Sequence, residues 1–329
     1  MLVHRAPSLP LFTSPSTVGR RAVLSALGLG AAGITLAACG GSDAASGKDL
    51  PVVIVGCYGL QYMAQQVAGD AAKVVNLAKP GMEPHDVELS VAETATVQKA
   101  DVIVQIPGFQ SALDDIVSAK KLEKNTIDVS EVVTLLPASG EHEHEDHEDE
   151  DHEDEHEHGR FDPHFWNDPT LLAKVASELG SRLAKVLPDQ ADTFTGNAKK
   201  AVTTLTDLDT ELKKTYGAVD GKRVFVTSHT AFAYLARRYG LEQVGIAGID
   251  PETEPSPRRL LALQRLIKKR KVSTVFFEES ASPKVAETLA KNVGVQSESL
   301  DNLETQLDPK KDYPAVMRED AEKLVESWT

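Results

Sequence analysis

The stretch that decides the fold is 189-DQADTFTGNAKKAVTTLTDLDTELKKTY-216. Its apolar side chains recur every three or four residues, at Phe194, Ala198, Ala201, Leu205, Leu208, Leu212 and Tyr216. This period places all of them on one face of a single continuous helix. At 1.5 Å per residue the helix would be about 42 Å long, which is long for a helix packed within one small domain. We therefore expect residues 188–217 to form a rigid helix that joins two lobes.

The sequence before this helix alternates between strand-like and helix-like segments. Strands are predicted at 51–57, 73–77, 101–106 and 126–129, and helices at 60–68, 87–99 and 110–119. Such alternation is typical of a parallel sheet covered by helices, because parallel strands need a long crossover between them. Residues 51–187 are therefore expected to form an N-terminal α/β lobe.

The sequence after the long helix repeats this rhythm. Strands are predicted at 223–227, 242–247, 272–277 and 296–300, and helices at 230–239, 257–270, 284–293 and 313–327. Residues 218–329 are therefore expected to form a C-terminal α/β lobe. The predicted fold class is α/β, with two lobes that each hold a mostly parallel sheet flanked by helices. Ligands of such sheets bind at the carboxyl ends of the strands, so we expect a site between the lobes.

The N-terminus is typical of an exported protein. A basic pair at Arg20 and Arg21 precedes an apolar run over 22–36, which is too short to span a bilayer as a helix. The following Leu36-Ala37-Ala38-Cys39 resembles the lipobox of bacterial lipoproteins. That resemblance implies a signal peptide at 1–38, a lipid on Cys39 and a flexible tether at 39–50. The basic pair is compatible with both twin-arginine and Sec export.

Composition separates one segment from the rest of the chain. Apolar residues make up 41% of the 329 residues, enough for a sizeable core. The net charge of −15 is concentrated in residues 141–158, which hold twelve acidic residues and neither Lys nor Arg. The rest of the mature chain is mildly acidic, and its surface would repel nucleic acid phosphates. We therefore expect no nucleic acid partner.

The acidic segment has no apolar residue to bury, so we expect a disordered loop there. It could serve only to keep the protein soluble. However, its acidic residues are interleaved with His142, His144, His147, His152, His156 and His158. Imidazoles beside carboxylates form weak zinc sites, and we favour an auxiliary metal-binding loop.

Three histidines remain in the sequence that is expected to fold. His85 lies in a loop after a predicted strand, His164 precedes a predicted helix cap at Asp168, and His229 directly follows a strand. Each histidine alone would more often be structural than a metal ligand. Their common position at the ends of elements favours a shared metal site, although spacing alone cannot establish that they converge.

Several motifs resemble one known family. They are Glu83-Pro84-His85-Asp86, Asp162-Pro163-His164-Phe165-Trp166, Ser228-His229-Thr230-Ala231-Phe232 and Glu254-Pro255-Ser256-Pro257. In this order they resemble the zinc/manganese solute-binding lipoproteins of ABC importers, from Pro51 to Trp328. One departure is Asn167, which stands where the family often has Leu.

The resemblance implies a metal site between the two lobes. It assigns His85, His164 and His229 as ligands, and a carboxylate at the end of the last strand, Asp301, as the fourth. Glu83 and Glu278 are rival carboxylates for that place. Three imidazoles and one carboxylate favour four-coordinate Zn(II) over manganese, which prefers oxygen-rich sites.

The resemblance also implies function and partners. We expect a monomeric, lipid-anchored protein on the outer face of the cytoplasmic membrane that delivers Zn(II) to the permease of an ABC importer. We expect no enzymatic activity. The alternatives are a manganese-specific member of the same family, a zinc-dependent hydrolase and an adhesin.

Overall fold

The computed structural model describes residues 50–80, 82–138, 161–221, 223–278 and 283–329. All of these residues belong to one compact unit, Lys48–Thr329. The predicted signal peptide at 1–38, Cys39 with nearly all of its tether, and the acidic segment at 141–158 lie outside the described residues.

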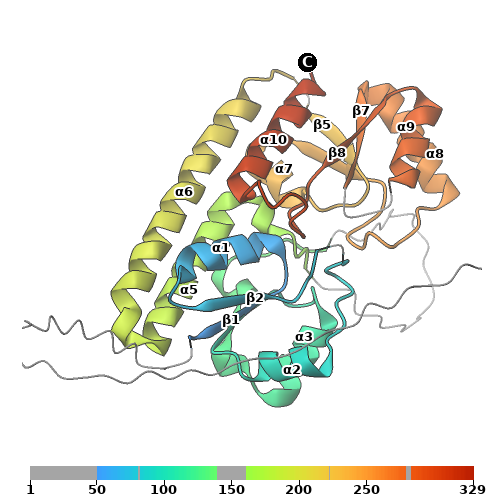
Figure 1. Cartoon of the computed structure of the whole chain (residues 1–329). Helices are drawn as coiled ribbons and strands as arrows, with labels where there is room; N and C mark the ends of the chain where they lie inside the picture. Colours follow the sequence, from blue (N-terminus) through green and yellow to red (C-terminus); the bar gives the residue numbers. More distant parts are fainter. Residues whose placement is uncertain (1–49, 81, 139–160, 222, 279–282) are drawn as a thin grey trace, which may run out of the picture. The chain divides into compact units, whose positions relative to one another are not determined.

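The first sheet contains four parallel strands in the order β2-β1-β3-β4 (Figure 1). These strands are β1 (Val52–Val55), β2 (Lys73–Asn76), β3 (Val102–Gln105) and β4 (Thr126–Asp128). The helices of this N-terminal lobe are α1 (Tyr58–Ala68), α2 (Val91–Gln98), α3 (Ser111–Lys120), α4 (Val129–Val132) and α5 (Pro169–Val186), with short 3-10 turns η1 (Glu123–Asn125) and η2 (Phe165–Asn167).

The second sheet repeats the same arrangement, in the order β6-β5-β7-β8, and again all strands are parallel. Its strands are β5 (Val224–Thr227), β6 (Glu242–Gly245), β7 (Thr274–Glu278) and β8 (Gln296–Leu300). The helices of this C-terminal lobe are α7 (Ala233–Tyr239), α8 (Pro257–Arg270), α9 (Lys284–Val293) and α10 (Tyr313–Glu326). The predicted fold class, two parallel sheets flanked by helices, is confirmed.

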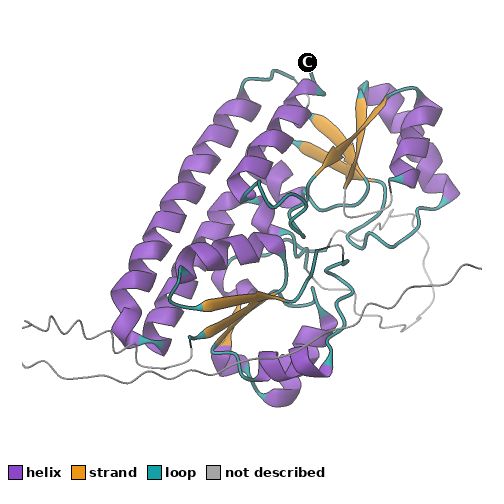
Figure 2. Ribbon diagram, in the orientation of Figure 1, coloured by secondary structure: helices purple, strands orange, loops and turns teal. Residues whose placement is uncertain are grey.

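The long helix is also confirmed. After a 3-10 turn, η3 (Pro188–Gln190), helix α6 runs over Ala191–Gly217 and lies beside α5 (Figure 2). Every residue of the predicted apolar stripe is buried. Burial of one helical face against neighbouring elements is what stabilises such a helix.

Helix α2 begins later than the sequence pattern predicts. The predicted segment 87–99 starts at Val87, whereas α2 starts at Val91. Ser90 is the N-cap, and Ser90 and Glu93 form a reciprocal capping box. The cap satisfies the first free N–H groups of the helix and therefore sets its start.

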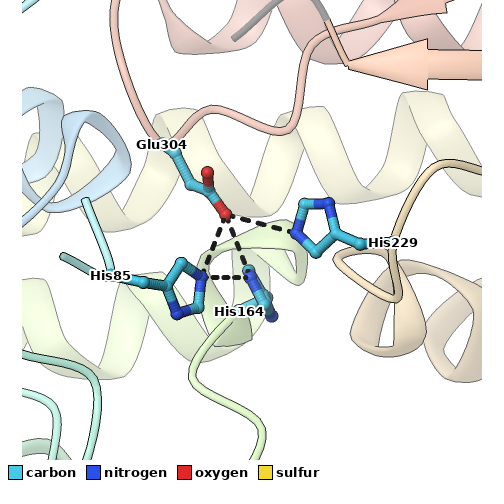
Figure 3. A group of neighbouring side chains, drawn as sticks. All are labelled: His85, His164, His229 and Glu304. Atoms are coloured by element: carbon cyan, nitrogen blue, oxygen red, sulfur yellow. Dashed lines mark hydrogen bonds and ion pairs between the residues drawn. The ribbon is translucent and has the colours of Figure 1, made fainter. Parts of the chain in front are cut away.

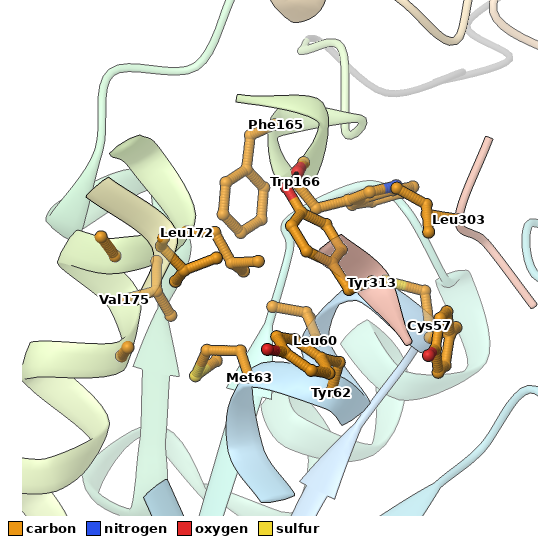
Figure 4. Packing of buried hydrophobic residues seen from close by; sticks show 14 of the residues in the cluster. Cys57, Leu60, Tyr62, Met63, Phe165, Trp166, Leu172, Val175, Leu303 and Tyr313 are labelled. Carbon is orange, nitrogen blue, oxygen red and sulfur yellow. Dashed lines mark hydrogen bonds between the residues drawn. The ribbon is translucent and has the colours of Figure 1, made fainter. Parts of the chain in front are cut away.

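One apolar cluster extends from the first lobe into the second. It contains residues of α1, α5, α6, α7 and α10, and also Leu303 from the connection after β8. Figure 4 shows part of this packing around Trp166 and Tyr313. Cys57 is fully buried in the same cluster. Within the described residues, every helix is too short or too polar to cross a membrane.

Candidate metal centre

The structure brings His85, His164 and His229 together with Glu304 (Figure 3). His85 lies in the connection from β2 to α2, and His164 directly precedes η2. His229 follows β5, and Glu304 lies in the connection from β8 to α10. Each ligand atom of this group lies within 4.8 Å of all the others.

The Nε2 atoms of the three imidazoles surround one oxygen of Glu304. Oε1 of Glu304 lies 3.0 Å from Nε2 of His164, 3.5 Å from Nε2 of His85 and 3.6 Å from Nε2 of His229. Nε2 of His85 and Nε2 of His164 are 3.3 Å apart. Two neutral imidazole nitrogens at this distance would repel each other unless a proton or a cation lay between them.

The spacing of the group fits a tetrahedral ion. With zinc–ligand bonds of about 2.0–2.1 Å, ligand atoms at the corners of a tetrahedron are about 3.3 Å apart. Four of the six separations within the group range from 3.0 to 3.6 Å, and all six lie within 4.8 Å. Nε2 of His229, which faces the centre, is buried without a hydrogen-bond partner among the described residues. A buried polar atom of this kind is normally satisfied, and a cation at the centre would satisfy it.

The electrostatic state of Glu304 suits a metal ligand. Burial would raise the pKa of this carboxyl, but its contacts with the imidazoles of His164, His229 and His85 outweigh burial and hold the pKa well below its usual range. Glu304 is therefore a carboxylate inside the protein and supplies negative charge directly to the centre.

Each of the two deeply buried imidazoles has a carboxylate behind it. Nδ1 of His164 lies 2.8 Å from Oδ1 of Asp162, and Nδ1 of His229 lies 3.4 Å from Oε1 of Glu278. A carboxylate that accepts the Nδ1 proton leaves the Nε2 lone pair available for a metal and fixes the orientation of the ring. The sequence pattern did not identify Asp162 in this role. The backbone N–H of His164 also donates to Oδ1 of Asp162, at 2.9 Å, and Asp is a residue type that commonly forms such an Asx-turn.

The pKa values of the three imidazoles differ in direction. Burial lowers the pKa of His85. Burial also opposes the charged forms of His164 and His229, but Asp162 and Glu304 raise the pKa of His164, and Glu278 and Glu304 raise that of His229 well above its ordinary value. The metal-free centre therefore retains protons that an incoming metal must displace.

Asp301, the fourth ligand expected from the sequence, does not join the group. Its Oδ1 accepts a hydrogen bond from the backbone N–H of Leu303 at 2.8 Å, so the carboxylate caps the turn instead. Leu303 has a φ of 61°, in the left-handed region. This turn brings Glu304, four residues beyond the end of β8, toward the imidazoles. A sequence motif that ends at the strand cannot show on which residue such a turn will present a carboxylate.

The two rival carboxylates lie next to the group but outside it. Glu83 accepts a hydrogen bond from the backbone N–H of His85 at 3.2 Å. Burial, followed by the nearby charge of Glu304, raises the pKa of Glu83 to about 7. Glu278 contacts the outward-facing nitrogen of His229 rather than the shared centre. Both residues therefore surround the four-residue group without belonging to it.

Most of the chain is similar to known proteins. The sequence profile of the family described as zinc-uptake complex component A, periplasmic, matches residues 53–327. The zinc-binding lipoprotein AdcA of Streptococcus pneumoniae R6 is 36% identical over 297 residues, which cover 88% of the chain and 58% of that relative. The chain thus spans little more than half the length of AdcA.

Two further comparisons involve a protein of similar length and a solved structure. The high-affinity zinc uptake system protein ZnuA of Bacillus subtilis is 35% identical over 306 residues, covering 89% of the chain and 94% of that protein. The crystal structure of Zn(II)-bound AdcA from Streptococcus pneumoniae matches with a TM-score of 0.70 and 31% identity, covering 85% of the chain and 58% of that structure. With its profile match and these relatives, the chain belongs to the family of zinc-uptake complex component A, periplasmic.

Proposed function

We propose that this protein captures Zn(II) outside the cytoplasmic membrane and delivers it to the permease of an ABC importer. The observation that carries the proposal is the convergence of three Nε2 atoms and one carboxylate oxygen at separations that suit a tetrahedral ion. His85, His164, His229 and Glu304 would be the ligands. The family match and the relatives that are named as zinc-binding support the same choice of metal.

The donor set favours zinc over manganese. Three imidazoles and one carboxylate are a common tetrahedral set for Zn(II), whereas Mn(II) prefers more oxygen donors and a higher coordination number. Glu83 lies beside the group and could add oxygen, but burial and the charge of Glu304 raise its pKa to about 7, so only about half of it is ionised at neutral pH and less below. A manganese-specific site is therefore the weaker candidate.

Binding rather than catalysis fits this set of donors. A catalytic zinc usually has three protein ligands and an open position at which water is activated. Here four protein groups would fill a tetrahedral shell, and three of the four are fully or almost fully buried. We therefore propose a transport role without turnover of substrate.

We propose the following organisation for the whole chain. Residues 1–38 direct export, Cys39 carries a lipid that anchors the protein to the membrane, and 39–50 form a tether. The N-terminal lobe spans 51–187 and the C-terminal lobe 218–329, with residues 188–217 as the connecting helix. The monomeric protein would collect weakly bound zinc on the six histidines of 141–158.

Titration calorimetry with Zn(II) tests the ligand set. The wild-type chain should show one tight site, and Glu304→Gln should weaken it by more than roughly 100-fold, because loss of an outer partner alone costs about 10- to 100-fold. Asp301→Asn is the matched control. It removes a carboxylate only three residues away, and the zinc affinity should stay close to that of the wild type.

A variant that lacks residues 141–158 separates the loop from the centre. It should lose only weak additional sites and keep the tight one. Loss of the tight site on deletion of the loop, or an equal effect of the Glu304 and Asp301 substitutions, would contradict the proposed ligand set. Delivery is tested in cells that lack their own zinc-binding protein. There the wild-type chain should restore growth in low zinc, and Glu304→Gln should not.

A further inference from the structure

The segment 162–168 of the N-terminal lobe is hydrogen-bonded to two connections of the C-terminal lobe, the ones that carry His229 and Glu304. It carries His164 itself, and all seven of its residues are buried. Two of its side chains donate hydrogen bonds to backbone carbonyls of the C-terminal lobe. These are the indole of Trp166 and the amide of Asn167.

Trp166 holds the connection that carries Glu304. Its Nε1–H donates to the carbonyl of Asn302 at 2.9 Å. The side-chain oxygen of Asn302 in turn accepts from the backbone N–H of Glu304 at 3.2 Å. Figure 4 shows the indole of Trp166 beside Leu303, which is fully buried despite its left-handed backbone. A non-glycine residue persists in that conformation only where its surroundings fix it.

The start of α1 holds the same connection from a second direction. The backbone N–H of Tyr58 donates to the carbonyl of Glu304 at 2.8 Å, and that of Gly59 donates to the carbonyl of Leu303 at 3.0 Å. Glu304 belongs by sequence to the C-terminal lobe, but its connection is bonded to the N-terminal lobe from two sides. Trp166 supplies the only side-chain donor among these three bonds.

Asn167 holds the connection that carries His229. Its Nδ2–H donates to the carbonyl of Ala231 at 3.0 Å, two residues after His229. Asn167 is 1% exposed, and its Oδ1 has no hydrogen-bond partner among the described residues. An unpaired buried amide oxygen lowers the stability of a fold, and what this side chain supplies in return is the bond to the carbonyl of Ala231. That bond joins the segment of His164 to the connection that carries His229.

We propose that Trp166 and Asn167 are positioning residues that fix Glu304 and His229, respectively, relative to His164. The inference rests on the proposed zinc function. Both side chains act on a backbone carbonyl close to a ligand from the opposite lobe, so they set how far apart the two halves of the centre lie. Loss of either bond should leave the fold intact and loosen the zinc site, because ligand atoms must be held to within about 0.5 Å for tight binding.

The indole bond is tested with Trp166→Phe, which removes the Nε1–H and retains an aromatic ring. The matched control is Trp328→Phe, because Nε1 of Trp328 also donates to a backbone carbonyl, that of Val224, at 2.7 Å. Zinc affinity is measured on the full chain by competition with a chromophoric chelator. Trp166→Phe should weaken it roughly 10- to 100-fold, as for other partners of metal ligands, and Trp328→Phe should leave it unchanged.

The amide bond is tested with Asn167→Leu, which also replaces the unpaired oxygen. The matched control is Asn125→Leu, because Nδ2 of Asn125 donates to the carbonyl of Ala100 at 2.9 Å within the N-terminal lobe. Asn167→Leu should release zinc to excess chelator at least about ten times faster than the wild type. The melting temperature of the metal-free protein should fall no further than in the control. Asn167→Ala offers the same test if the leucine variant does not fold.

A purely structural role predicts a different result. It would lower the melting temperature of the metal-free protein and leave zinc affinity and release unchanged in the folded fraction. That result for both variants would overturn the inference, as would equal losses of affinity in the two controls. A wild-type chain without a tight zinc site would instead refute the proposed function itself, so the two failures are distinguishable.

Discussion

At the residue scale, Glu304 sets the electrostatics of the centre. Oε1 of this one buried carboxylate faces three imidazole nitrogens, and its charge is retained despite complete burial. A Zn(II) ion there would keep a net charge of about +1 after ligation, since imidazoles are neutral ligands. The carboxylates of Asp162 and Glu278, each against an outward-facing Nδ1, would further balance that charge.

Zinc affinity should fall as the pH is lowered, and the fall should begin above the ordinary histidine pKa of 6.5. Only a neutral imidazole can ligate, and the pKa values of His164 and His229 are raised in the metal-free centre. Those two rings therefore hold protons up to a higher pH than a solvent-exposed histidine. Zinc binding should release up to about two protons near neutral pH.

Calorimetry in buffers with different ionisation enthalpies measures this proton release directly. The wild-type chain should release protons on binding, and its affinity should rise between pH 6 and pH 8. A zinc affinity that stays constant over this interval would contradict the assigned protonation states. The comparison is best made with residues 141–158 removed, because the histidines of that segment titrate in the same range.

Only some of the residues of the centre could be predicted from the sequence. His85, His164 and His229 could be selected because each stands at the end of a predicted element. The fourth member of the group, the carboxylate of Glu304, could not be selected, because Asp301 and Glu304 are only three residues apart in one connection. Their roles depend on a left-handed turn at Leu303, a residue type that seldom adopts that conformation. No local pattern predicts such a turn.

At the scale of elements, periodicity predicted most of the fold. Helices α8 and α9 and strand β8 have the bounds expected from sequence, and α6 buries the whole predicted stripe. Helices with a strong apolar period, such as α9, were well defined, because this signal is local. The start of α2 was missed by four residues, since the capping box at Ser90 outweighs the apolar residues before it. For α5, the sequence marked the cap at Asp168 but not the extent of the helix.

The contact between α5 and α6 should depend on one glycine. A Cβ on Gly180 would lie 2.5 Å from the Cβ of Ala198 and 3.2 Å from the carbonyl oxygen of Phe194, both on α6. Gly180→Ala should therefore lower the free energy of unfolding by about 1–3 kcal/mol, because overpacking outweighs the gain in helix propensity.

Gly196→Ala is the matched control within α6. A Cβ there would meet nothing within 4 Å. This substitution should raise the free energy of unfolding by about 0.5–1 kcal/mol, the usual difference in helix propensity between Gly and Ala. Chemical denaturation of both variants measures the two effects. Equal shifts in the same direction would show that the helices do not approach each other closely at Gly180.

At the scale of the whole molecule, the metal centre is built from loops that connect the helices and strands. Its four side chains come from four separate connections, and three of these follow the carboxyl ends of β2, β5 and β8. Two parallel sheets of the same strand order present these ends to each other (Figure 1). The topology rule for α/β sheets therefore predicted where the site lies, whereas the bonds from Trp166 and Asn167 that join the connections are visible only in the folded protein.

The most direct test of the account is X-ray absorption at the zinc K edge, on the chain without residues 141–158 and with one equivalent of Zn(II). The account predicts four nitrogen or oxygen neighbours at about 2.0–2.1 Å, with the outer-shell scattering of three imidazoles. A sulfur neighbour at about 2.3 Å, from either Cys57 or Cys39, would contradict it. A six-coordinate oxygen shell, or fewer than three imidazoles, would contradict it equally.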